Sequence, residues 1–169
     1  MDDDRHDGSN KMEEGMETEI TIPDKILRLK GINIFEGLSV SELAAIASVT
    51  EEMDCRKDEF VIKEGEAGET MFLIIKGTVS VLKGVGEEGA REIELARIGV
   101  GDYFGEMALF EDAVRSASIK ASEDSRFLVL HKQEFTEIVR EYPQIALHIC
   151  KALSGRMREL HEKLQNYEK

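Results

Sequence analysis

Short runs of alternating apolar and polar residues, repeatedly broken by glycine, fill the stretch from Cys55 to Leu130. Side chains of a strand point alternately to its two faces, so each run can bury one face, and glycine permits the tight turns between runs. The pattern predicts strands at residues 60–63, 71–75, 78–83, 92–98, 116–121 and 126–130, with an exposed hairpin loop at residues 84–90. Short strands at this spacing predict an antiparallel sandwich or β-roll, and we expect the roll, a double-stranded jelly roll.

Helical patterns flank the predicted roll, at about residues 25–50 and 132–167. Ser39 and Glu42 have the spacing of a capping box, which predicts a helix that begins at about Val40. The side chains that this helix turns inward are Leu43, Ile46 and Ala47. The fold class is therefore mainly β, with an N-terminal helix and a C-terminal lid or dimer helix around a roll at about residues 55–130.

The last predicted helix begins at Pro143, because proline cannot continue a preceding helix but fits a first turn. Apolar residues recur along it at alternating steps of four and three, the a/d pattern of a heptad repeat: Ala146, Cys150, Leu153, Met157, Leu160, Leu164 and Tyr167. Such a helix packs either on its own domain or on a copy of itself. A homodimer would use Leu153, Met157, Leu160 and Leu164.

The length of 169 residues suits one domain, which we expect at residues 20–169. Residues 1–19 hold eight acidic side chains against two basic ones without apolar periodicity, which predicts a disordered acidic tail. This tail lacks the basic start and apolar stretch of a signal peptide. The longest apolar runs, such as residues 71–75, are far shorter than a membrane span.

The net charge of −13 argues against contact with nucleic acid, because affinity for a phosphate backbone comes from lysine and arginine. Any anion bound by this chain must therefore be small and held by local contacts. Cys55 and Cys150 belong to no CxxC motif or histidine cluster. We expect two reduced, buried thiols and a cytoplasmic location.

Arg115 raises the main functional question. In residues 115–121, alternation puts Ala117, Ile119 and Ala121 on one face, and Arg115 shares their parity. A guanidinium keeps its proton, and a buried charge without a partner is strongly destabilising. An anion should therefore lie opposite Arg115. This anion is either Glu106 or a bound ligand. If it is Glu106, the two residues form a structural ion pair in a domain that binds no ligand.

The loop that precedes Arg115 offers further groups for an anion. Gly105 precedes a segment with the composition of one or two helical turns, and free N–H groups at a helix start favour an anion. The backbone N–H groups of Gly105, Met107 and Ala108 are candidate donors. Glu106 beside a phosphate requires a hydroxyl or Arg115 as its own partner. A sugar phosphate satisfies both requirements.

These residues carry a resemblance to a known family. The sequence Phe104-Gly-Glu-Met-Ala-Leu109, followed after five residues by Arg115-Ser-Ala-Ser118, resembles the phosphate-binding cassette of cyclic nucleotide-binding domains. These domains occur in catabolite activator proteins and in regulatory subunits of protein kinase A. The resemblance extends over about residues 30–165 and includes the segments 60–65, 68–77 and 98–105.

The resemblance implies a role for each cassette residue. Glu106 would accept a hydrogen bond from the ribose 2′-hydroxyl, and Arg115 would pair with the cyclic phosphate. Ser116 would add a hydroxyl bond to the phosphate. The backbone groups that complete the cradle are those of Gly105, Met107 and Ala108.

The resemblance also implies where the base rests. Its expected contacts are Val81 and Leu95 from the roll and Leu160 from the last helix. Leu160 stands where the catabolite activator has a hydroxyl residue, which implies loose discrimination between bases. Ser116 stands where many kinase regulatory domains have Ala and cGMP-selective domains have Thr, so cAMP is favoured and cGMP stays open.

We therefore expect a regulatory sensor that binds a cyclic nucleotide and moves its C-terminal helix to control an attached or separate effector. No nucleophile with a base and no metal cluster is indicated, so we expect neither an enzyme nor a cofactor. The alternative is an interaction domain with a vestigial cassette, which dimerises through the heptad helix.

Overall fold

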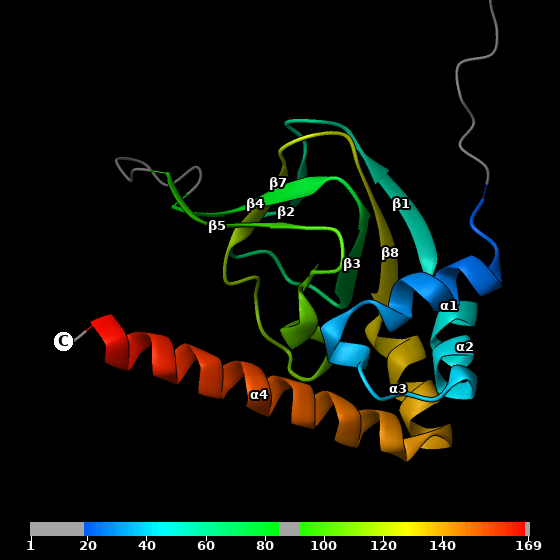
Figure 1. Cartoon of the computed structure of the whole chain (residues 1–169). Coiled ribbons are helices and arrows are strands. Elements are labelled where there is room, and N and C mark those ends of the chain that lie inside the picture. The colour runs from blue at the N-terminus through cyan, green and yellow to red at the C-terminus, as the bar shows by residue number, and fades with distance from the viewer. Residues whose placement is uncertain (1–18, 85–91, 168–169) are drawn as a thin grey trace, which may run out of the picture.

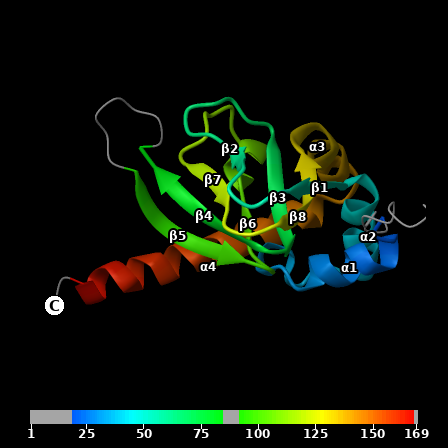
Figure 2. The same cartoon turned by 90° about the horizontal axis from the view of Figure 1, so that it is seen from above.

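The computed structural model describes residues 19–84 and 92–167. The tail predicted for residues 1–19 and the hairpin loop predicted for residues 84–90 lie almost wholly outside the described residues. Within them, eight strands form two four-stranded antiparallel sheets, as Figures 1 and 2 show. The strands are β1 (Glu51–Cys55), β2 (Phe60–Ile62), β3 (Thr70–Lys76), β4 (Thr78–Lys83), β5 (Ile93–Gly99), β6 (Tyr103–Phe104), β7 (Ser118–Ala121) and β8 (Ser125–His131).

The first sheet has the strand order β1-β8-β3-β6, and the second has the order β2-β7-β4-β5. The predicted antiparallel roll is confirmed. Two strands were not predicted, and each has a physical reason. β1 is an edge strand with only Cys55 buried, so its sequence lacks an apolar face, and β6 has just two residues.

Helices gather beside the first sheet (Figure 1). They are α1 (Ile22–Lys30), the 3₁₀ turn η1 (Asn33–Phe35), α2 (Val40–Val49), α3 (Lys132–Glu141) and α4 (Pro143–Tyr167); a second 3₁₀ turn, η2 (Glu106–Leu109), lies between β6 and β7. The predicted capping box is confirmed, because the Ser39 hydroxyl accepts from the Glu42 N–H and the Glu42 carboxylate accepts from the Ser39 N–H. The predicted inward residues Leu43, Ile46 and Ala47 are buried.

Alternation along β3 divides the core into two clusters. Met71 and Leu73 face the helices, whereas Phe72 and Ile74 face the interior of the roll. Phe72 stacks on Phe104 with ring centroids 5.0 Å apart, and Phe127 meets the Phe104 ring edge-on at 5.6 Å. This aromatic cluster supports the end of β6, from which the η2 turn starts.

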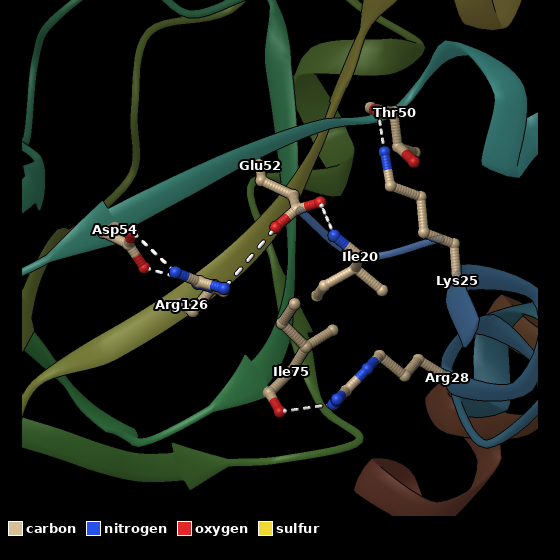
Figure 3. A network of polar contacts seen from close by, with 8 residues as sticks. All are labelled: Ile20, Lys25, Arg28, Thr50, Glu52, Asp54, Ile75 and Arg126. Atoms are coloured by element: carbon tan, nitrogen blue, oxygen red, sulfur yellow. Dashed lines mark hydrogen bonds and ion pairs between the residues drawn. The ribbon is translucent and has the colours of Figure 1, made fainter. Parts of the chain in front are cut away.

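Polar contacts fix α1 to the roll (Figure 3). The buried Lys25 donates from Nζ to the Thr50 carbonyl at 2.8 Å, and Arg28 donates from Nη1 to the Ile75 carbonyl at 3.0 Å. On the neighbouring strands, Arg126 holds Asp54 through two hydrogen bonds of 2.6 and 2.9 Å. The two buried cations in this region, Lys25 and Arg126, therefore have hydrogen-bond acceptors, as their desolvation requires.

The helix α4 (Pro143–Tyr167) places its buried residues in its first half. Ile145 and Ile149 are fully buried there, and the second half runs below the roll toward the C-terminus (Figure 1). Cys150 is exposed, so the prediction of two buried thiols is correct for Cys55 and wrong for Cys150. The helix turns Ile149 rather than Cys150 toward the core, and Met157 is 70% exposed.

Candidate functional site

Arg115 is buried, with only 7% of its surface exposed, and it has neutral partners. Its Nη1 donates to the Thr70 carbonyl at 2.9 Å and more weakly to the Gly105 carbonyl at 3.4 Å, and its Nη2 donates to the Thr70 hydroxyl at 2.8 Å. Among the described residues, no carboxylate oxygen lies within 4.0 Å of this guanidinium. Burial lowers the pKa of Arg115, and the charge of Glu66 opposes that shift. The site holds a positive charge without a bonded counter-ion.

Two glycines make room for the Arg115 side chain. A Cβ atom on Gly68 would lie 2.1 Å from Arg115 Nε, and one on Gly105 would lie 2.7 Å from Nη1. Gly105 also has a φ of 77°, a left-handed conformation that favours glycine, and it caps the start of η2. The backbone of Arg115 is held as well, because its N–H donates to the Glu66 carbonyl at 2.8 Å. The two loops that flank Arg115 therefore fix its position.

A cavity of about 270 Å³ opens between η2, the second sheet and α4. Its polar lining includes Arg115, Ser116 and Glu106. Its other walls come from both sheets and are mainly apolar: Ile62, Val81, Ala96, Ile98, Tyr103, Phe104 and Ile119. Such a cavity suits a small ligand with an anionic group and a flat apolar part.

Glu106 does not pair with Arg115. Its Oε1 lies 3.7 Å from Nη1 of Arg156, which comes from α4 and also lies over the Tyr103 ring at 5.3 Å. Burial alone would lower the pKa of Arg156, but the Tyr103 hydroxyl and the Glu106 carboxylate contribute to a net rise. The hypothesis of a structural ion pair between Arg115 and Glu106 is wrong in this conformation.

Seven of the nine residues predicted for the site line this one cavity: Val81, Gly105, Glu106, Met107, Ala108, Arg115 and Ser116. Of the three predicted backbone donors, the N–H of Ala108 donates to the Gly105 carbonyl at 3.2 Å. Ser116 is exposed, and Lys83 Nζ donates to its carbonyl at 2.8 Å. Its hydroxyl has no hydrogen bond among the described residues.

Leu95 and Leu160 lie outside the cavity, with exposed fractions of 58% and 53%. A β-bulge opposite Val81 and Leu82 inserts Leu95 as an extra residue, so Ala96 and Ile98 become the wall instead. On α4, Arg156 reaches the cavity and Leu160 does not. Arg156 was not predicted from the sequence. The one indication in the sequence is that Arg156 stands four residues before Leu160, and so on the same face of the helix.

The cavity, the buried cation and the short turn at Gly105 together define the class of protein. It is a β-roll domain whose cavity, lined by residues of both sheets, suits a small anionic ligand. Residues 52–142, more than half of the chain, match the family model of the cyclic nucleotide-binding domain, and the chain belongs to this family.

Relatives and solved structures agree. The cyclic AMP receptor protein of Thermus thermophilus is 30% identical over 78% of this chain and 60% of its own length. The human cGMP-dependent protein kinase 2 is 32% identical over 72% of this chain, which spans only 16% of the kinase. The crystal structure of the Thermus thermophilus catabolite activator protein superposes with a TM-score of 0.70 at 28% identity, over 80% of this chain and 63% of that one.

The chain is thus a cyclic nucleotide-binding regulatory domain, and it spans 60% of the length of the Thermus receptor protein and 16% of that of the human kinase. Among the residues that the structure describes, no helix is long and apolar enough to cross a membrane. Residues 19–84 and 92–167 contain no group of three His, Cys, Asp or Glu side chains that could hold a metal ion.

Proposed function

We propose that this domain binds cAMP at the cavity and reports its presence by moving α4. The observation that carries the proposal is Arg115, a buried guanidinium without a carboxylate partner among the described residues, on the wall of a cavity of about 270 Å³. A ligand phosphate would neutralise it, and charge-assisted hydrogen bonds of this type contribute about 1.5–3 kcal/mol each.

We assign the ligand one orientation in this cavity. The cyclic phosphate lies against Arg115 and the Ser116 hydroxyl, and the ribose lies beside Glu106. The base then rests on the apolar walls, with Val81 and Ile98 among its contacts. No further cofactor takes part in this mode of binding.

The movement of α4 starts at Glu106. In the described conformation Glu106 and Arg156 form an ion pair at the rim of the cavity. A ribose hydroxyl that donates to Glu106 competes with Arg156 for the same carboxylate. Ligand binding thereby frees α4 to change its angle and cover the base, which brings Leu160 toward it. A domain that is only partly closed without ligand binds more weakly in proportion to its closed fraction.

The choice of cAMP over cGMP is supported by the cavity walls. The relatives do not discriminate, because the cyclic AMP receptor protein of Thermus thermophilus is named for cAMP and the human kinase, at similar identity, is named for cGMP. The strand residues Ile62, Val81, Ala96, Ile98 and Ile119 give the cavity apolar walls. Guanine carries one more polar exocyclic group than adenine, and burial of unpaired polar groups is unfavourable.

We also propose that α4 binds a second copy of the chain. Met157 and Leu160 are exposed on its second half, and both belong to the heptad pattern with Leu153 and Leu164. Two such helices would bury each other's apolar residues. If the cassette is vestigial and binds no nucleotide, dimerisation through α4 is the alternative function.

Isothermal titration calorimetry with cAMP and then cGMP tests the proposed function. We expect heat and a thermal shift with both nucleotides and the tighter binding with cAMP. Absence of heat and of a thermal shift with either nucleotide would reject the sensor and leave the interaction domain. Tighter binding of cGMP would overturn only the choice of base.

A further inference from the structure

Among the described residues, some N–H groups of the Arg115 guanidinium have a hydrogen-bond acceptor and others have none. A guanidinium has five N–H groups in a planar fork. Two are on Nη1, which donates to the Thr70 and Gly105 carbonyls, and one of the pair on Nη2 donates to the Thr70 hydroxyl. The Nε–H and the second hydrogen of Nη2 have no acceptor among the described residues. These two hydrogens form the side edge of the guanidinium.

The same edge holds a carboxylate elsewhere in this protein. Arg126 donates from Nε and Nη2 to the two oxygens of Asp54, at 2.6 and 2.9 Å. A bidentate fork of this kind also fits two oxygens of a phosphate. Arg115 therefore has the donor pair that a phosphate requires, provided that its plane is held in the right orientation.

Thr70 provides that orientation. It is the first residue of β3, and it contacts both terminal nitrogens of Arg115, one through its carbonyl and one through its hydroxyl. Its backbone is fixed by the pairing of β3 with β8, in which Thr70 lies opposite His131. From the roll interior, Phe72 lies 5.9 Å from the Arg115 guanidinium. Rotation of the guanidinium would break both Thr70 bonds.

We infer that Thr70 is a positioning residue for the phosphate of the ligand, a role that rests on the proposed function. Its hydroxyl and carbonyl occupy one edge of the Arg115 guanidinium and leave the Nε and Nη2 edge for two phosphate oxygens. Thr70 itself does not line the cavity, so it acts through Arg115.

Three variants of the full chain test this role by calorimetry with cAMP. Thr70→Val keeps the shape but removes the hydroxyl, and we expect about a tenfold loss of affinity. Thr70→Ser restores the hydroxyl and should bind within about threefold of the wild type. The matched control is Thr78→Val, because Thr78 is the first residue of β4 and donates its hydroxyl to Glu123, away from the cavity. The control should bind like the wild type.

A double-mutant cycle separates positioning from a general structural effect. In an Arg115→Lys background the fork is gone, so Thr70→Val should cause no further loss of affinity. Wild-type affinity of Thr70→Val for cAMP would overturn the inference. The inference is also overturned if Thr70→Val lowers the affinity for cAMP by the same tenfold in the Arg115→Lys background. If the wild type itself binds neither cAMP nor cGMP, the proposed function fails and this inference fails with it.

Discussion

Glu106 Oε1 and Arg156 Nη1 lie 3.7 Å apart, so an ion pair joins the η2 turn to α4 at the rim of the cavity. Glu106 belongs to the cassette that holds the ligand, and Arg156 belongs to the helix that would respond to it. Because a partly exposed ion pair of this length contributes little to stability, a ligand can displace it at small cost. Loss of this ion pair is therefore the first step of the proposed movement of α4.

The contact between Glu106 and the ribose predicts a specific coupling. For the wild type, we expect 2′-deoxy-cAMP to bind about tenfold more weakly than cAMP, because Glu106 loses its hydroxyl donor. In Glu106→Ala, which removes the acceptor, the two ligands should differ by less than about threefold. Competition calorimetry measures both ratios, with Glu111→Ala as the control on an exposed neighbour. Equal discrimination in wild type and Glu106→Ala would show that the ribose lies elsewhere.

The movement of α4 predicts a change in distance between the helix and the roll. Spin labels at Glu159→Cys and Arg97→Cys, in a Cys150→Ser background, report this distance by electron–electron double resonance. We expect saturating cAMP to shift the distribution, and Arg156→Ala to broaden it without ligand because the ion pair to Glu106 is lost. A label pair within the roll should not respond. If cAMP leaves the first distribution unchanged, α4 does not carry the signal.

The pair of Arg126 and Asp54 predicts a dependence of stability on pH. Arg126 lowers the pKa of Asp54, so the folded state binds this proton less readily than the unfolded state. Asp54 therefore stabilises the fold above its unfolded pKa of about 4, and the contribution is lost as pH falls through the lower folded value. Asp54→Asn should lower the free energy of unfolding at pH 7 by about 1 kcal/mol or less, since the Asp54 side chain is 68% exposed.

Urea unfolding at pH 7 and at pH 2.5 measures this difference. The two proteins should differ at pH 7 and converge at pH 2.5. Glu137→Gln, an exposed carboxylate on α3, controls for the change in net charge. A difference between wild type and Asp54→Asn that is the same at both pH values would contradict the assignment.

The exposed half of α4 predicts a dimer in solution. Sedimentation velocity should show a dimer for the wild type and a monomer for the double variant Met157→Lys and Leu160→Lys, because the lysines place charge in the apolar seam. Leu147→Lys is the matched control, since Leu147 is 54% exposed on the same helix but lies off the heptad positions. A wild type that sediments as a monomer would contradict the proposed dimer.

Local patterns in the sequence were sufficient for much of the fold. The capping box at Ser39 and the strand at residues 71–75 depend on neighbours a few residues apart, and both predictions are confirmed. The burial of Arg115 is confirmed, but strand alternation is not its cause, because β7 begins only at Ser118 and residues 116–117 form a bend. The edge strand β1 escaped prediction because an edge strand with one buried residue has no apolar face.

The parts of the site that sequence reasoning missed depend on tertiary geometry. A single bulge in β5 changes which residues face the cavity, and it exchanges Leu95 for Ala96 and Ile98. The residue of α4 that meets the cavity depends on the angle of the helix, so Arg156 rather than Leu160 lies there. The role of Thr70 was not predicted, because Thr70 and Arg115 are in contact but lie 45 residues apart in the sequence.

The central claim is that Arg115 is buried in order to bind the phosphate of a cyclic nucleotide. Calorimetric titration of Arg115→Ala with cAMP tests it most directly, with Arg97→Ala, an exposed arginine of β5, as the control and thermal unfolding as the measure of folding. The account predicts that Arg115→Ala stays folded and loses well over tenfold in affinity, while Arg97→Ala binds as the wild type does. A folded Arg115→Ala protein with wild-type affinity for cAMP would contradict it.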